Sequence, residues 1–167
     1  MKIRYKHQRF QAEAAKCVSD VFQGQPKHDG SRTFLNEFGA LNFDGFGNLP
    51  LVLDNESICE NVRGIQMAEG LNPVEHLEGD GRTFTIEMET GTGKTYVYLR
   101  TIFELSQKYG FKKFIIVVPS VAIREGALKN IEITADHFKA LYNNIEFEHF
   151  VYDSKKANRL RQFATSN

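Results

Sequence analysis

The sequence lacks several features that would assign it directly to a class. Its 21 Lys and Arg residues balance 21 Asp and Glu residues, so overall charge does not indicate nucleic-acid binding. The two cysteines, Cys17 and Cys59, fit no metal-binding spacing, which favours free thiols in a reducing compartment. The basic N-terminus has no apolar stretch of the kind found in signal peptides, and the apolar run 114–118 is far too short to span a bilayer. We therefore expect a soluble, cytoplasmic protein without a membrane partner.

The composition that remains is that of an ordinary globular domain. Apolar residues make up 41% and charged residues 25% of 167 residues, enough for one domain with its own core. The charge is unevenly distributed, with basic residues near both ends and mainly acidic residues from 44 to 80. Charged residues that only face solvent explain this distribution as well as charged residues that bind a partner do.

Hydrophobic periodicity predicts alternating strands and helices. The expected helices are 10–22, 58–69 with Ser57 and Glu60 as a capping box, 94–109 ending at Gly110, 121–130 capped by Ser120, 134–144 and 154–163. The expected strands are 51–54, 82–88, 114–118 and 145–152, and residues 23–50 show no sustained period. The alternation after residue 83 favours an α/β fold with a mainly parallel sheet and helices on its faces.

The most informative motif lies within TIEMETGTGKTYVYL, residues 85–99. Gly91-Thr92-Gly93-Lys94-Thr95 stands between a predicted strand and a predicted helix, the context of a phosphate-binding loop. Glycines let backbone N–H groups turn toward an anion at a helix N-terminus. Lys94 would reach the outer phosphates and the Thr95 hydroxyl would bind Mg²⁺. The general pattern has glycine where this chain has Met88, and a glycine-rich turn with a solvated lysine is the simpler alternative.

The loop alone does not identify the class of protein, because kinases, GTPases, transporters and helicases all contain it. The neighbouring segments provide further evidence. Phe10 could stack on adenine and the Gln11 amide could pair with its edge, although a core Phe beside an exposed Gln gives the same pattern. Ser120 in PSVAIREG could present a helix N-terminus to a nucleic-acid phosphate or act only as a cap. The basic residues after 154 could follow a phosphate backbone or simply be solvated.

Three segments together resemble the restriction subunit of type III restriction enzymes, within the superfamily 2 helicase group. EMETGTGKTYVYLRTIFEL (87–105) and KFIIVVPSVAIREGALKNI (113–131) are similar to the first two motor motifs of that family. RFQAEAAKCVSDVFQGQ (9–25) is similar to its upstream glutamine motif. The family tolerates methionine at the position of Met88. The resemblance covers most of the chain, and 26–80 is the part in which no motif is found. It implies a partial RecA-like P-loop NTPase domain with helices on both faces of the sheet.

The resemblance implies roles for individual residues. Phe10 and Gln11 would contact adenine, and the rest of the ATP site would consist of Thr90, Gly91, Thr92, Gly93, Lys94, Thr95 and Tyr96. Lys94 and Thr95 would be the catalytic members, with Mg²⁺ held through the Thr95 hydroxyl. Ser120, Val121 and Arg124 would contact one DNA strand. The implied partners are double-stranded DNA and the methylation subunit of a restriction system.

The resemblance also implies an incomplete N-terminal motor domain over 1–167, made of a glutamine-motif helix (1–25), an insert (26–80) and the P-loop core (81–167). The family needs an aspartate–glutamate pair on a later strand, and no two acidic residues after the loop are adjacent here. A second motor domain and a nuclease domain are also not found. We expect the ATP-binding part of a DNA-dependent ATPase or translocase that does not hydrolyse ATP efficiently alone.

Two other functions fit the loop. One is a stand-alone P-loop enzyme of the kinase type, although no arginine-rich lid is evident. The other is a non-catalytic remnant that binds nucleotide or protein. For the main hypothesis, strand 83–88 would form an unpaired apolar sheet edge, which predicts self-association.

Overall fold

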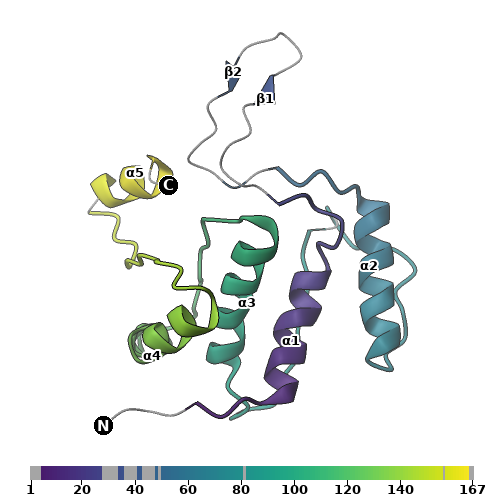
Figure 1. Ribbon diagram of the computed structural model, residues 1–167, viewed down its shortest axis with the longest axis horizontal. Helices are drawn as coiled ribbons and strands as arrows, with labels where there is room; N and C mark the ends of the chain where they lie inside the picture. Colours follow the sequence, from purple (N-terminus) through teal and green to yellow (C-terminus); the bar gives the residue numbers. More distant parts are fainter. Residues whose placement is uncertain are drawn as a thin grey trace.

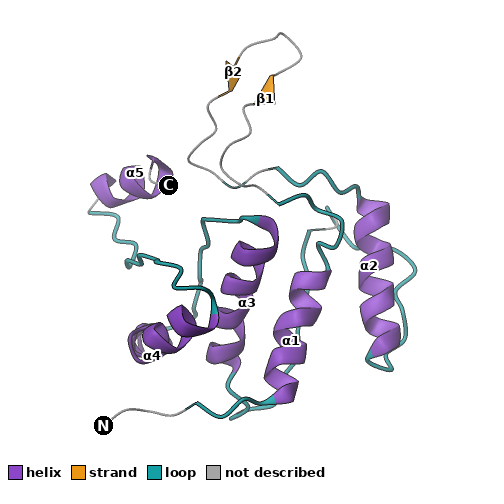
Figure 2. Cartoon of the chain, viewed as in Figure 1, coloured by secondary structure: helices purple, strands orange, loops and turns teal. Residues whose placement is uncertain are grey.

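The computed structural model describes residues 5–27, 34–35, 41–42, 48, 50–80, 82–155 and 157–165. Within these ranges the regular structure is almost entirely helical (Figures 1 and 2). The elements in chain order are α1 (Arg9–Asp20), β1 (Phe34–Leu35), β2 (Leu41–Asn42), α2 (Asn55–Ala68), α3 (Lys94–Tyr109), α4 (Val121–Leu141) and α5 (Ala157–Thr165).

Helices α1 and α3 lie side by side and run in the same direction (Figure 1). At their N-terminal ends, the Gln11 side-chain amide donates to the Thr92 carbonyl at 2.9 Å. At their C-terminal ends, the Tyr109 hydroxyl donates to the Ser19 carbonyl, also at 2.9 Å. Between these contacts Ala15 is fully buried, and its small side chain suits a close helix–helix approach. The two helices are therefore joined at both ends.

The main apolar core lies between α3 and α4. Figure 1 shows α4 nearly end-on beside α3, so the two helices cross steeply. The Phe103 ring stacks on Phe138 at 4.9 Å and on Tyr142 at 5.3 Å between centroids. Leu99 and Ile131 complete the buried cluster. Ring stacking and burial of these side chains both stabilise the contact between α3 and α4.

Several helix predictions are confirmed with adjusted ends. Helix α3 spans the predicted 94–109 and ends at Gly110, whose φ of 73° is left-handed. Ser120 caps α4 as predicted, its hydroxyl accepting from the Ile123 N–H. Helix α2 begins earlier than predicted because Asp54, not Ser57, is the N-cap. The helices predicted at 121–130 and 134–144 are one continuous α4.

The predicted α/β fold with a parallel sheet is wrong for the described residues. Segments 51–54, 82–88, 114–118 and 145–152 contain no strand. The only sheet in the described ranges is the antiparallel pair β1–β2, in which Phe34 faces Asn42. The sheet edge expected at 83–88 is therefore absent. The predicted self-association depended on that edge, so the structure gives no support for it.

A β-strand forms backbone hydrogen bonds with a neighbouring strand. Within the described residues, none of these four segments has such a neighbour. The run 114–118 has the β-branched composition of a buried strand, but Ile115 is 80% and Val117 88% exposed. Phe114 and Val118 are half-buried. Ile116 is also 40% exposed, so only the two ends of this segment are partly covered, whereas the sequence predicted a strand covered on both faces.

Replacing Phe138 with alanine should lower the free energy of unfolding by about 3–5 kcal/mol, because the ring is 1% exposed and packs on both Phe103 and Tyr142. Urea denaturation followed by circular dichroism measures this loss. Met67→Ala, at a position 61% exposed on α2, should change it by less than about 0.5 kcal/mol. Equal losses in both variants would contradict an α3–α4 core centred on Phe138.

Candidate functional site

The glycine-rich segment forms a compact turn directly before α3. The Thr92 hydroxyl donates to the Glu89 carbonyl at 2.6 Å, and this closes the turn. Gly91 and Gly93 have φ of 83° and 88°, in the left-handed region that residues with a Cβ rarely adopt. Both glycines of the motif are therefore required by backbone conformation.

Lys94, the first residue of α3, is folded back over this turn. Its ammonium group donates to the Met88 carbonyl at 2.6 Å and to the Glu89 carbonyl at 3.0 Å. The side chain is exposed and is not fixed in the core. Thr95 follows in the same helical turn and is partly buried. The loop thus brings a cation and a hydroxyl to one helix start.

Two helix N-termini meet beside this loop. Since α1 and α3 are parallel and joined through Gln11 and Thr92, both helices start at the same end of the molecule (Figure 1). Neither start has a side-chain cap, and neither has an acidic residue in its first turn. The positive ends of both helix dipoles are therefore left uncompensated by the chain, which favours an anion at this place.

The structure brings the predicted glutamine to the predicted loop. The Gln11 side chain is partly buried against Thr92, and a Cβ built on Gly93 would lie 2.6 Å from its Nε2 atom. Phe10 lies next to it in the first turn of α1 and is 46% exposed. Gly93 is therefore required by its φ angle, and a Cβ at this position would also displace the Gln11 amide from Thr92.

Tyr96 belongs to an aromatic cluster that sequence reasoning did not predict. Its hydroxyl lies 2.9 Å from Nε2 of His137 on α4, and its ring stacks on Phe138 at 5.1 Å. The Tyr5 ring lies 4.4 Å from His137. Burial lowers the pKa of His137, and the Arg100 guanidinium lowers it further. The Tyr96 side chain thus contacts α4, and no sequence spacing links residues 5, 96 and 137.

The predicted DNA-contacting residues lie together in the first turn of α4. Val121 is 63% exposed, and the Arg124 guanidinium forms an ion pair with neighbouring Glu125 at 2.9 Å. Ser120 is exposed, but its hydroxyl is used by the cap. The three residues share one helix end.

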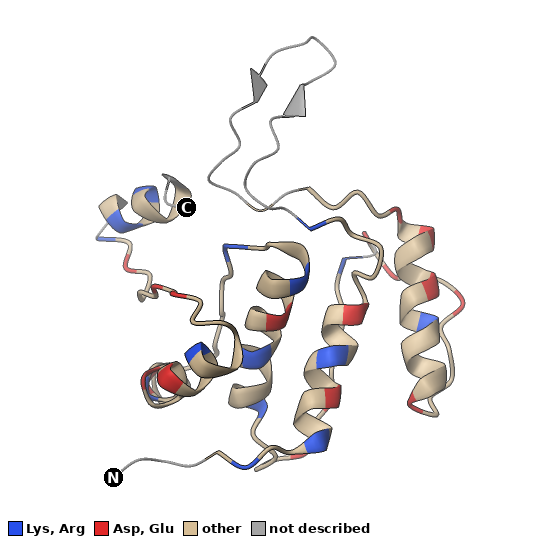
Figure 3. Cartoon of the chain, in the orientation of Figure 1, with Lys and Arg blue, Asp and Glu red and all other residues tan. Residues whose placement is uncertain are grey.

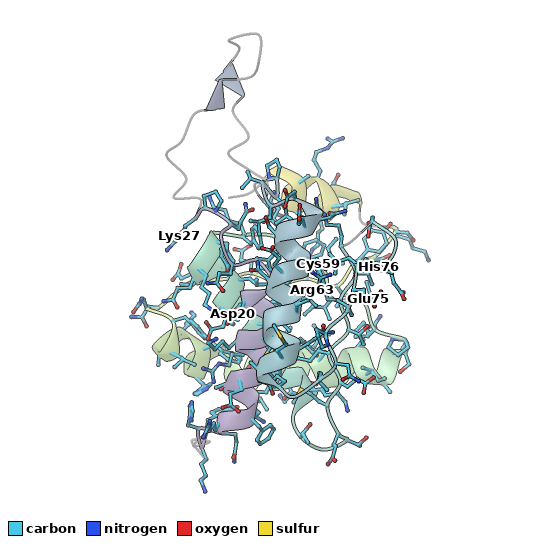
Figure 4. All side chains as sticks on the ribbon, turned by 90° about the vertical axis from the view of Figure 1, so that its right-hand side faces the viewer. Asp20, Lys27, Cys59, Arg63, Glu75 and His76 are labelled. Carbon is cyan, nitrogen blue, oxygen red and sulfur yellow. The ribbon has the colours of Figure 1, made fainter. Side chains whose placement is uncertain are left out.

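Residues of the predicted insert are held by Arg63 of α2. Figure 4 shows Cys59, Arg63, Glu75 and His76 gathered where α2 faces the segment after it. The Arg63 guanidinium donates to the carbonyls of Val74, at 2.7 Å, and Glu75. A hollow of about 360 Å³ lies beside these residues. Arg63 therefore fixes the backbone of this segment.

Two further observations apply to the described residues. They contain no group of three His, Cys, Asp or Glu side chains arranged to bind a metal ion. None of their helices combines the length and hydropathy needed to cross a bilayer.

Comparison with known proteins settles the family. Residues 56–165, about two thirds of the chain, match the family model described as type III restriction enzyme, res subunit. The chain belongs to the type III restriction enzyme Res subunit family. The resemblance carried by the loop and by the segment after 113 is thus confirmed.

Individual Res subunits show the same similarity. The Res subunit of EcoPI from Escherichia phage P1 is 37% identical over 115 residues, and that of EcoP15I from Escherichia coli is 33% identical over 112. Each alignment covers 65% of this chain and 11% of the relative. The StyLTI Res subunit from Salmonella typhimurium is 49% identical over 100 residues, covering 55% of this chain and 10% of the relative. The chain spans about a tenth of the length of these relatives.

A double-mutant cycle tests the joint between Gln11 and the loop. Gly91→Ala should cost about 1–2 kcal/mol, since a Cβ there meets nothing within 4 Å and only the φ angle is unfavourable. Gly93→Ala should cost more, because the Cβ also displaces the Gln11 amide. When Gln11 is also replaced by alanine, the Gly91→Ala and Gly93→Ala variants should have similar free energies of unfolding. Urea unfolding of both glycine variants, each with and without Gln11→Ala, measures this difference. A difference that Gln11→Ala leaves unchanged would contradict the contact.

Acidification should destabilise the Tyr96–His137 cluster. The folded state has the lower His137 pKa, so the contribution of His137 to stability is complete above its ordinary pKa of about 6.5 and is lost as pH falls through the folded value. His137→Gln, which keeps a polar partner for Tyr96, should flatten the fall in urea midpoint between about pH 7.5 and about pH 5.5. The same change at exposed His149 serves as control; equal flattening there would contradict the assignment.

Proposed function

We propose that this chain is the ATP-binding part of the DNA-dependent ATPase or translocase of a type III restriction endonuclease. The observation that carries the proposal is the arrangement at the start of α3. Two uncapped parallel helix N-termini, two left-handed glycines and the Lys94 ammonium group lie at one place. Such a set of donors and positive charge suits the phosphates of a nucleotide.

The residues present fit ATP with Mg²⁺. Gly91 has open space where a Cβ would be, so a phosphate can approach its backbone closely. Lys94 would exchange a carbonyl contact for phosphate oxygens, and the Thr95 hydroxyl would be the protein ligand of Mg²⁺. One or two protein ligands are enough for Mg²⁺ bound mainly to phosphates and water. Bound ATP would supply the free energy of hydrolysis for movement along DNA.

The adenine would lie on the α1 side of the loop. Gln11 is already fixed there through its Nε2 donor to Thr92, and among the described residues its Oε1 has no donor. Phe10, 46% exposed beside it, offers a ring for stacking. Thr90 and Tyr96 complete the predicted nucleotide contacts, Tyr96 through its backbone.

The partners follow from the family. The relatives' names describe Res subunits of restriction–modification enzymes. For this chain we propose double-stranded DNA, contacted through Ser120, Val121 and Arg124, and a methylation subunit as the second protein.

Lys94→Ala should abolish binding of a non-hydrolysable ATP analogue in the presence of Mg²⁺. Isothermal titration calorimetry measures the affinity. The matched control is Lys112→Ala, which removes an exposed lysine away from the loop and should bind as the unmodified chain does. Equal and measurable affinities of the Lys94 and Lys112 variants would contradict the nucleotide site. No nucleotide binding by the unmodified chain or by either variant would favour a non-catalytic remnant that binds protein.

The chain alone should turn ATP over slowly with or without duplex DNA. The described residues offer no acidic cluster to complete the metal site or orient water. Phosphate release assays with and without DNA measure this. Phosphate transfer from labelled ATP to a small metabolite would instead favour the kinase-type alternative.

A further inference from the structure

Tyr5 lies in the short segment before α1 and contacts two other helices. Its hydroxyl donates to the Ile133 carbonyl of α4 at 3.1 Å, and its ring lies 4.4 Å from the His137 ring. The same ring is stacked on Tyr96 of α3, with 6.2 Å between centroids and 21° between ring planes. Figure 1 shows this segment leading from beside α3 and α4 to the start of α1. Tyr5 therefore links the chain just before α1 to both helices.

The start of α1 lacks a side-chain cap. Gln8 is the N-cap residue, but its side chain makes no capping hydrogen bond. The first backbone hydrogen bond of the helix runs from the Ala12 N–H to the Gln8 carbonyl and is 3.2 Å long. Phe10 in this first turn is 46% exposed. A helix end without a cap and with exposed side chains opens easily unless other contacts hold it.

Two side chains tie this helix start to other parts of the chain. Gln11 donates to the Thr92 carbonyl of the glycine-rich loop, and Tyr5 contacts α4. Phe10 stands between these two residues in the sequence. Without the Tyr5 contacts, the turn would be held on the loop side alone and would open from Gln8 toward Gln11. The Tyr5 contacts therefore limit the movement of Phe10 and Gln11.

The free atom of the Gln11 amide suits one purine better than the other. Its Nε2 atom donates to Thr92, and among the described residues its Oε1 atom has no donor. An acceptor at this place suits adenine, which carries an amino group at C6, whereas guanine carries a carbonyl oxygen there. Two acceptors that face each other cost binding free energy, but only while the glutamine side chain is held in position. Discrimination between the purines thus depends on a fixed start of α1.

We infer that Tyr5 is a positioning residue for purine recognition: its contacts with α4 hold the start of α1, so that Phe10 and Gln11 favour adenine over guanine. The inference rests on the proposed function in taking a nucleotide as the ligand. Tyr5 acts through the helix start and does not itself contact the base. Its loss should therefore alter the choice of base more than the binding of the phosphates.

The first experiment measures amide hydrogen exchange by NMR in the 167-residue chain without nucleotide. The Ala12 N–H reports opening of the first turn of α1, and the Arg124 N–H, which donates to the Ser120 carbonyl at 3.0 Å, reports the same position in α4. Tyr5→Phe removes only the hydroxyl and should speed Ala12 exchange by about two- to tenfold. Tyr5→Ala also removes the ring contacts and should speed it further. Arg124 exchange should not change.

The matched control is Tyr152→Ala, which removes a tyrosine side chain that is 65% exposed in the segment before α5. It should leave Ala12 exchange as in the unmodified chain. Equal Ala12 exchange in the Tyr5→Ala and Tyr152→Ala variants would contradict the anchoring of α1. Equal acceleration of Ala12 and Arg124 exchange in Tyr5→Ala would indicate general destabilisation and would contradict a positioning role.

The second experiment compares the affinities for the β,γ-imido analogues of ATP and GTP by isothermal titration calorimetry with Mg²⁺. The unmodified chain should bind the ATP analogue more tightly. Tyr5→Ala should lower the ratio of the two affinities by at least about threefold, because the Gln11 acceptor is no longer held in place. Gln11→Ala should lower the ratio as well, and combining it with Tyr5→Ala should lower the ratio no further. The phosphates are common to both analogues, so the ratio isolates the base.

The affinity ratio separates the inference from the proposed function. Equal losses of affinity for both analogues in Tyr5→Ala would overturn the inference and leave the nucleotide site in place. A ratio that Tyr5→Ala lowers equally with and without Gln11 would also overturn it, since Tyr5 would then act by another route. No binding of either analogue by the unmodified chain would contradict the proposed function itself, and the purine selectivity with it.

Discussion

The parallel contact between α1 and α3 is the constraint on which the rest of the described structure depends. Parallel helices align their dipoles, so like partial charges adjoin at both ends. At the C-terminal end, Lys108 contacts both the Ser19 hydroxyl and the Asp20 carboxylate. Burial alone would raise the pKa of Asp20, but Lys16 and Lys108 together hold it below its ordinary value. Lysine side chains thus lie at the C-terminal end, whereas at the N-terminal end neither helix has a side-chain cap or an acidic residue in its first turn. An anion at the loop would offset the positive ends of the two dipoles in the same way.

The sequence predicts the helices because their determinants are local. The left-handed Gly110 ends α3, and Ser120 starts α4, each through a contact within a few residues. The division of α4 at residues 131–133 was wrong because Ile131 is buried against α3, and this tertiary contact outweighs the weak helix preference of β-branched residues. Strands depend on distant partners instead. The runs at 82–88 and 114–118 have strand composition, but composition cannot state whether a partner is present.

The candidate site likewise has local features that the sequence predicts and long-range contacts that it does not. Gly91, Gly93 and Lys94 follow from the spacing of one motif, since each acts within the turn that contains it. The contact between Gln11 and Thr92 spans 81 positions, so the sequence could indicate a nucleotide role for both segments but not their hydrogen bond. The family resemblance implies a DNA contact for Arg124, and Arg159 belongs to the basic segment after residue 154. Both residues line one hollow, which is a property of the fold, and residues 124 and 159 show no shared pattern.

The one departure from the general phosphate-loop pattern has a structural explanation. Glycine at the position of Met88 would be needed if the backbone there were left-handed or closely approached. Met88 is not among the described residues with positive φ, so a side chain is tolerated. What the loop uses at this position is the carbonyl, which accepts from Lys94 at 2.6 Å and is supplied equally by any residue. The requirement for glycine is therefore confined to positions 91 and 93, where φ is positive. A loop with methionine at 88 can thus keep the turn, the lysine position and the open helix start that a phosphate needs.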